Sequence, residues 1–168
     1  MQKLLVIKLW EVINLDFKLS QKETMILEDA KGQEDICIKK YESFANQAKD
    51  PELKQLFNKL ALQEQHHLDM INELMQGKTP NMNHNANNKS APPTNSKEKL
   101  TFNSPQDALL CSDLLSTEKY VSGFYDTGVF EAANKPVRET LQHIQKEEQR
   151  HGEELFNYMN THGMYNVK

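Results

Sequence analysis

Apolar residues recur every three or four positions in four long segments of this chain, a spacing typical of helices that bury one face. In each segment, one glutamate stands on the stripe where an apolar residue is expected. These glutamates are Glu34, Glu64, Glu118 and Glu148. Beyond residue 20 no segment alternates with the period of a strand, so the pattern gives no support to a parallel sheet. The sequence therefore predicts an all-α fold.

Signals that begin and end helices divide the four segments. Each of the first three segments starts at a small polar residue, which caps the first turn, together with a glutamate or a proline that favours that turn, and the fourth follows a break. The start signals are Ser20 with Glu23, Asp50 with Pro51, Ser104 with Pro105, and the break at Asn134–Pro136. We expect helices over about 21–48, from 51 to about Met75 before Gly77, over about 105–132, and from the last break to about 160.

Residues 77–104 are rich in Asn, Ser and Pro and contain few apolar residues, which predicts a flexible linker. Short turns make consecutive helices antiparallel neighbours, whereas this linker is long enough to cross a bundle. We therefore predict a single domain over residues 20–161. It is a four-helix bundle made of two helical hairpins, with a long crossover between the second and third helices. Residues 162–168 are expected to form a C-terminal tail.

Residues 1–19 are expected to form an N-terminal arm outside the bundle. Residues 10–13 can be encoded by a sequence that contains GGAGGTGAT, which is a ribosome-binding sequence, and Leu15 can be encoded by a TTG start codon. One interpretation is therefore that residues 1–14 are not native protein. The alternative is a short helix or arm. Charged residues interrupt the apolar run and no small-residue cleavage site follows it, so we expect no secretory signal peptide.

Composition excludes several classes of protein. The net charge is −4 and the pI is about 5.9, so no basic footprint for nucleic acid is present. No apolar stretch approaches the ~18 residues that span a bilayer, so we expect no membrane partner. Two cysteines are too few for a four-cysteine metal site, and we expect Cys37 and Cys111 to be buried thiols. Charged pairs such as Lys146–Glu147 are expected on the solvated surface.

Four polar residues recur in the second half of the chain at a displacement of 84 positions. Glu34, Tyr41, Glu64 and His67 are matched by Glu118, Tyr125, Glu148 and His151. The two glutamates of each half are equidistant from the turn between their helices, roughly 22 Å from it at 1.5 Å per residue. The halves thus look like a duplicated helical hairpin, and packing them together brings four glutamates and two histidines into one layer.

Four charged carboxylates in one buried layer are very costly unless they are neutralised. Two divalent cations cancel four negative charges, and two neutral histidines add nitrogen ligands. In each Glu-x-x-His sequence both side chains lie on one helix face and can reach the same ion. The pattern therefore predicts two bound metal ions, iron or alternatively manganese. The alternative is a polar network that contains no metal.

These six residues resemble the ligand set of the ferritin-like superfamily, and the resemblance covers about residues 21–160. It implies that Glu64 and Glu148 bridge the two metals and that the other four residues are terminal ligands. Tyr41 and Tyr125 are then expected to hydrogen-bond a ligand on a neighbouring helix. The alternative is that these tyrosines are simply core aromatics with a polar tip.

Residues 114–167 resemble the Coat F domain of endospore-forming bacteria, through the sequences TEKY, ANKPVR and FNYMNTHGMY. This resemblance implies a protein of the spore coat, or of the mother-cell or forespore cytoplasm, with other coat proteins as partners and a homo-oligomer, a dimer, as its assembly. The implied function is a sporulation protein with a dinuclear metal centre. The alternative is an enzyme, a di-iron oxidase or peroxidase that acts on Fe(II), O2 or H2O2.

Overall fold

The computed structural model describes residues 16–82 and 104–167. Over these residues the chain forms four helices and no strand, which confirms the all-α prediction. They are α2 (Gln21–Gln47), α3 (Pro51–Met75), α4 (Pro105–Glu131) and α5 (Lys135–Thr161). Each bound lies within one residue of its expected position. Most of the predicted arm and linker, and the last residue of the predicted tail, lie outside the described residues.

The caps that were expected from the sequence are present. The Ser20 hydroxyl accepts from the Glu23 amide while the Glu23 carboxylate accepts from the Ser20 amide, which completes a capping box. The Asp50 carboxylate caps α3, and the Ser104 hydroxyl accepts from the Asp107 amide at the start of α4. Gly77 follows α3 with a φ of 70°, a left-handed conformation that glycine adopts without steric cost and that ends the helix.

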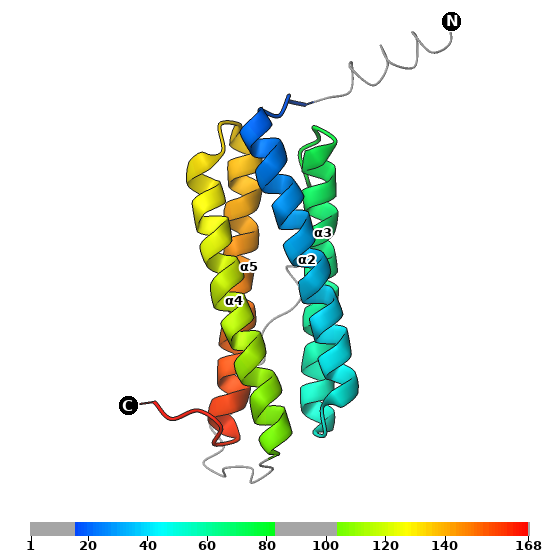
Figure 1. Ribbon diagram of the computed structural model, residues 1–168, viewed down its shortest axis with the longest axis vertical. Helices are drawn as coiled ribbons and strands as arrows, with labels where there is room; N and C mark the ends of the chain where they lie inside the picture. Colours follow the sequence, from blue (N-terminus) through cyan, green and yellow to red (C-terminus); the bar gives the residue numbers. More distant parts are fainter. Residues whose placement is uncertain (1–15, 83–103, 168) are drawn as a thin grey trace, which may run out of the picture.

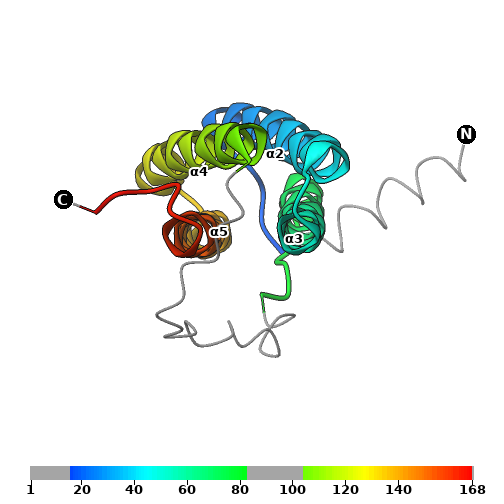
Figure 2. The same ribbon diagram turned by 90° about the horizontal axis from the view of Figure 1, so that it is seen from below.

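The helices lie side by side as a bundle whose long axis is vertical in Figure 1. Consecutive helices form the closest pairs, α2 with α3 and α4 with α5. Viewed along the axis in Figure 2, α2 lies beside α4 and α3 lies across from α5. The residue colours in Figure 1 show that α2 and α4 run in opposite directions. This arrangement brings the middle of all four helices to the same height.

Two buried carboxylates join the helical pairs at opposite ends of the bundle. Near the start of α2, the Glu23 carboxylate accepts from the Asn134 amide at 2.7 Å, in the turn between α4 and α5. Near the start of α4, the Asp107 carboxylate accepts from the amides of Lys49 and Asp50 at 2.9 and 3.0 Å. Glu23 and Asp107 are again 84 positions apart, so the same contact is made twice. Each helical pair therefore supplies one carboxylate that accepts hydrogen bonds from the turn of the other pair.

The apolar core consists of two clusters, one toward each end of the bundle. One contains Phe57, Leu114 and Leu155, and the other contains Leu27, Ile71, Leu141 and Ile144. Cys37 and Cys111 are buried free thiols within these clusters, as expected. Among the described residues, no helix combines the length and apolar character required to cross a membrane.

The first residues of the predicted linker are packed against the bundle. Gly77 and Pro80 are buried, the Asp16 amide donates to the Gly77 carbonyl at 2.8 Å, and the Thr79 amide donates to the Asp16 carboxylate at 2.8 Å. The segment before α2 and the segment after α3 are therefore hydrogen-bonded to each other beside the end of α3.

Candidate metal centre

Six polar side chains meet halfway along the bundle, between the two apolar clusters. They come from all four helices, and each is at most 3% exposed. They are Glu34 on α2, Glu64 and His67 on α3, Glu118 on α4, and Glu148 and His151 on α5. The structure brings together all six residues that the sequence singled out.

The six residues form two overlapping groups. In each group, one ligand atom per residue lies within 4.8 Å of the corresponding atoms of the other three. The first group contains Glu34, Glu64, His67 and Glu148, and the second contains Glu64, Glu118, Glu148 and His151. Glu64 and Glu148 belong to both groups. Each group could hold one metal ion, with these two glutamates between the two positions.

The histidines present the same ring nitrogen to the carboxylates. His67 Nδ1 lies 3.2 Å from Glu64 Oε2 and 3.1 Å from Glu148 Oε1. His151 Nδ1 lies 3.0 Å from Glu64 Oε1 and 3.7 Å from Glu118 Oε2. The two rings are stacked, with centroids 5.4 Å apart. The remaining nitrogen of each ring, Nε2, therefore faces away from the four glutamates of the cluster.

Several buried oxygen atoms at the centre have no hydrogen-bond partner among the described residues. They are Glu34 Oε2, Glu118 Oε2 and Glu148 Oε2. Such atoms are rare in native proteins, because a buried polar group without a partner carries its full desolvation penalty. Carboxylate oxygens with imidazole nitrogens form a ligand set that suits iron and manganese. The residues present therefore fit a pair of divalent cations.

The pKa values of the four glutamates differ between two pairs. Glu34 and Glu118, which belong to one group each, are the outer pair, and Glu64 and Glu148, which belong to both groups, are the inner pair. Burial raises the pKa of Glu34 to about 8, and it raises the pKa of Glu118 well above its usual 4.5. Burial also opposes ionisation of Glu64 and Glu148, but contacts with the histidines outweigh it and lower the pKa of both. Without metal, the outer carboxyls therefore hold protons near neutral pH and the inner carboxyls are charged.

The histidines carry charge that compensates the inner carboxylates. Burial alone lowers the pKa of a histidine, yet the carboxylates around His67 and His151 raise the pKa of both well above 6.5. A cation that binds Nδ1 must displace the proton from that nitrogen. The outer glutamates and the two histidines therefore hold protons that compete with metal.

The two tyrosines connect the helical pairs across the centre. Tyr41 on α2 donates its hydroxyl hydrogen to Glu118 Oε1 on α4, and Tyr125 on α4 donates to Glu34 Oε1 on α2. Both side chains are fully buried, so they also serve as core aromatics. Each hydrogen bond leaves the other oxygen of its glutamate directed at the cluster, which fixes the orientation of the carboxylate.

Glu147 is a member of the site that the sequence reasoning missed. We expected it on the solvated surface, but it is only 7% exposed, and its Oε2 lies 3.0 Å from His67 Nε2. The available signal was its position three residues after Ile144 and four before His151, which places it near the buried face of α5. A charged neighbour of His67 holds the ring so that Nδ1 faces the cluster.

The equivalent residue in the first helical pair is Gln63, 84 positions earlier. The Oε1 atom of Gln63 and the Nε2 atom of His151 are buried and without a hydrogen-bond partner among the described residues. The two histidines are therefore supported differently. His67 Nε2 contacts an anionic carboxylate, whereas the residue equivalent to Glu147 in the first helical pair is a neutral amide.

The fold and the site define a four-helix bundle whose core contains a buried carboxylate and histidine cluster. Residues 106–168, which include all but the first residue of α4 and the whole of α5, match the family model of the Coat F domain. This match includes the region in which the sequence resemblance was found. Neither the curated proteins nor the solved structures provide a match.

Proposed function

We propose that this protein is a ferritin-like protein of the spore coat, or of the sporulating cell, that binds a dinuclear metal centre in its bundle core. The observation that carries the proposal is the pair of overlapping four-residue groups that share Glu64 and Glu148. A chance cluster of acidic residues would not place two shared carboxylates between two equivalent Glu and His pairs.

In this proposal, Glu64 and Glu148 bridge the two metal ions. Glu34 and His67 complete the ligands of one ion, and Glu118 and His151 complete those of the other. The tyrosine hydroxyls hold the outer glutamates, and Glu147 holds His67. Two iron ions in these positions would supply two electrons to dioxygen or hydrogen peroxide, one from each ion.

The direct test is the metal content of the purified protein. Metal-free protein titrated anaerobically with Fe(II) or Mn(II) should bind two ions per chain, counted by elemental analysis after gel filtration. Folded protein that retains no ion would contradict the metal centre and would support a proton-sharing polar network in its place.

The coat assignment rests on the Coat F match over α4 and α5. It predicts that the protein, followed by antibody in a sporulating culture of its source organism, appears in extracts of the spore coat together with other coat proteins. Vegetative cells should contain little of it. Equal amounts in both fractions would remove the support for a role in the coat.

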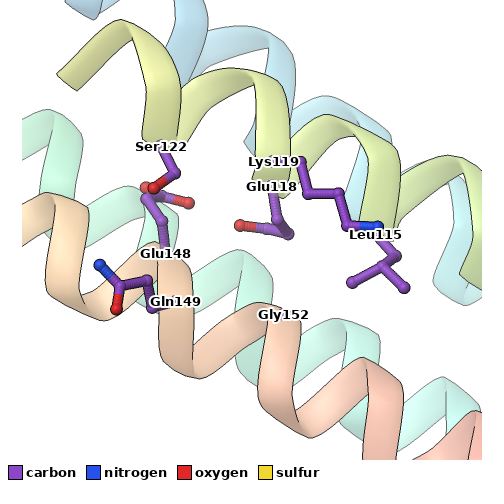
Figure 3. Close-up of a pocket in the computed structure, with 7 residues that line it drawn as sticks. All are labelled: Leu115, Glu118, Lys119, Ser122, Glu148, Gln149 and Gly152. Atoms are coloured by element: carbon purple, nitrogen blue, oxygen red, sulfur yellow. The ribbon is translucent and has the colours of Figure 1, made fainter. Parts of the chain in front are cut away.

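A second candidate function is a di-iron oxidase or peroxidase. It is favoured by a pocket between α4 and α5 that reaches Glu118 and Glu148, since an enzyme needs access for its substrate (Figure 3). Such an enzyme should consume Fe(II) with O2 or H2O2 over many turnovers and lose this activity in Glu64→Ala. A protein whose metal serves only stability should lose stability alone.

The contrast between Glu147 and Gln63 leads to a further prediction. Glu147→Gln should weaken the binding of the ion beside His67 by about 10–100-fold, because the ring loses its anionic partner. The ion beside His151, whose Nε2 already has no anionic partner, should bind as before. The two unequal steps that calorimetric titration resolves in the parent should therefore move closer together in the variant. Glu153→Gln, an exposed change on the same helix, is the control. Unchanged binding of both ions in Glu147→Gln would show that Glu147 has no orienting role.

A further inference from the structure

A pocket of about 360 Å³ lies between α4 and α5 and connects exposed residues with the buried centre. Exposed Lys119 and Gln149 lie at its rim, and buried Glu118 and Glu148 also line it. Figure 3 shows both glutamates between the two helices, with Glu148 on the side of Ser122 and Glu118 on the side of Leu115. We propose that this pocket is the route by which hydrated divalent cations reach the metal centre, and that the equivalent position between α2 and α3 is closed. The inference rests on the proposed metal centre.

Comparison of the two helical pairs supports an opening beside α5 and a closed position beside α3. Ser122 and Gly152 line the pocket, and the residues 84 positions earlier are Ile38 and Leu68. Both of these larger side chains are half-buried in the α2 and α3 pair. Ile38 and Leu68 are branched apolar residues. The equivalent residues of the second pair are much smaller, since Ser122 has only a hydroxymethyl group and Gly152 has only a hydrogen atom. The duplicated pairs have the same ligands and differ in the side chains beside them.

The packing of α5 does not require a glycine at position 152. A Cβ atom placed there would contact only the Cδ1 atom of Leu115, at an ordinary 3.7 Å. Glycine in the interior of a helix is less favourable than alanine, so a larger residue at this position should not weaken the helix. The absence of a side chain at Gly152 keeps space open beside Glu148.

The chemistry of the pocket suits a cation. Glu118 Oε2 and Glu148 Oε2 have no hydrogen-bond partner among the described residues, and each side chain is at least nine-tenths buried. A divalent ion with six water molecules needs roughly 200 Å³, at about 30 Å³ for each water-sized volume. The pocket can therefore admit the hydrated ion and present carboxylate oxygens that replace its water.

The test is the rate at which metal-free protein takes up Co(II), followed by stopped-flow absorbance of the coordinated ion. In Gly152→Leu the rate should fall on the order of tenfold or more, while the final number of bound ions stays at two per chain. Gly152→Ala should give a smaller decrease. The matched control is Gly123→Leu, which makes the same change on α4 where a Cβ meets nothing within 4 Å, and it should take up Co(II) at the parent rate.

A rescue variant separates blocked access from general damage. Adding Leu68→Gly to Gly152→Leu opens the equivalent position of the other pair and should restore much of the lost rate. If Gly152→Leu binds two ions at the parent rate, the route is wrong and the metal centre stands. If the parent itself binds no Co(II) at equilibrium, both the centre and the route are wrong.

Discussion

Replacing both Glu64 and Glu148 with alanine should reduce the bound metal from two ions per chain to none. These two residues belong to both four-residue groups, so their removal deprives each ion of two carboxylate ligands. The remaining ligands, one glutamate and one histidine for each position, are too few to hold a divalent ion against water. The measurement is elemental analysis after loading with Fe(II) or Mn(II) and removal of free metal.

Single variants should distinguish the two positions. Glu34→Ala should lose the ion beside His67, and Glu118→Ala should lose the ion beside His151, each leaving about one ion per chain. The matched control is the double change Glu73→Ala with Glu153→Ala, which removes exposed glutamates from α3 and α5. It should keep both ions. Retention of two ions in the Glu64 and Glu148 double variant would contradict the bridging arrangement.

The double variant should remain folded without metal. Its two alanines remove carboxylates that hold charge on His67 and His151, and the two imidazoles can then lose their protons and stay buried as neutral groups. Because the lost contacts with the histidines favour the folded state, the unfolding midpoint in urea, measured with a chelator, should be lower than that of the metal-free parent, while the transition stays cooperative. A loss of metal with this result cannot be attributed to unfolding.

The stability of the metal-free protein should fall as the pH rises from 5 to 8. The pKa of Glu34 is raised from 4.5 to about 8 and that of Glu118 well above 4.5. The pKa values of His67 and His151 are raised above 6.5. The folded state therefore binds more protons than the unfolded chain over this range. Each additional bound proton lowers the free energy of unfolding by about 1.4 kcal/mol per pH unit.

Bound metal should abolish this dependence or reverse it. The cations replace the protons on these four residues, so metal binds more tightly as the pH rises and adds stability through its preference for the folded state. The lowered pKa values of Glu64 and Glu148 act in the opposite sense, but mainly below pH 4.5. Urea unfolding at pH 5, 6, 7 and 8, with chelator and with Mn(II), checks the prediction. Parallel curves in the two conditions would contradict it.

Much of the fold could be predicted from the sequence because its signals are local. Ser20 with Glu23, and Ser104 with Pro105, begin helices through contacts within a few residues, and the structure places both caps as expected. The six candidate ligands were visible because each interrupts a regular apolar stripe. Because they recur at a displacement of 84 positions, the sequence also predicted that helices far apart along the chain bring them into one layer.

What the sequence did not reveal depends on contacts between helices. Glu147 lies in a charged run beside Glu148, and its spacing from Ile144 and His151 places it near the buried face without showing what it contacts. Its role follows from the 3.0 Å approach of His67 on another helix. The contact of Glu23 with Asn134 likewise joins residues 111 positions apart. The pocket beside Gly152 arises from missing side-chain volume, which no residue pattern marks directly.

The reciprocal caps at the two ends of the bundle give this single chain an internal two-fold symmetry. Glu23 holds the turn of the second pair, and Asp107 holds the turn of the first through the equivalent contact. Such an exchange is the interaction expected between two identical subunits related by a two-fold axis. The present chain therefore has the architecture of a symmetric dimer fused into one polypeptide. The two halves share this exchange and differ beside the ligands, where the first has Ile38 and Leu68 and the second has Ser122 and Gly152.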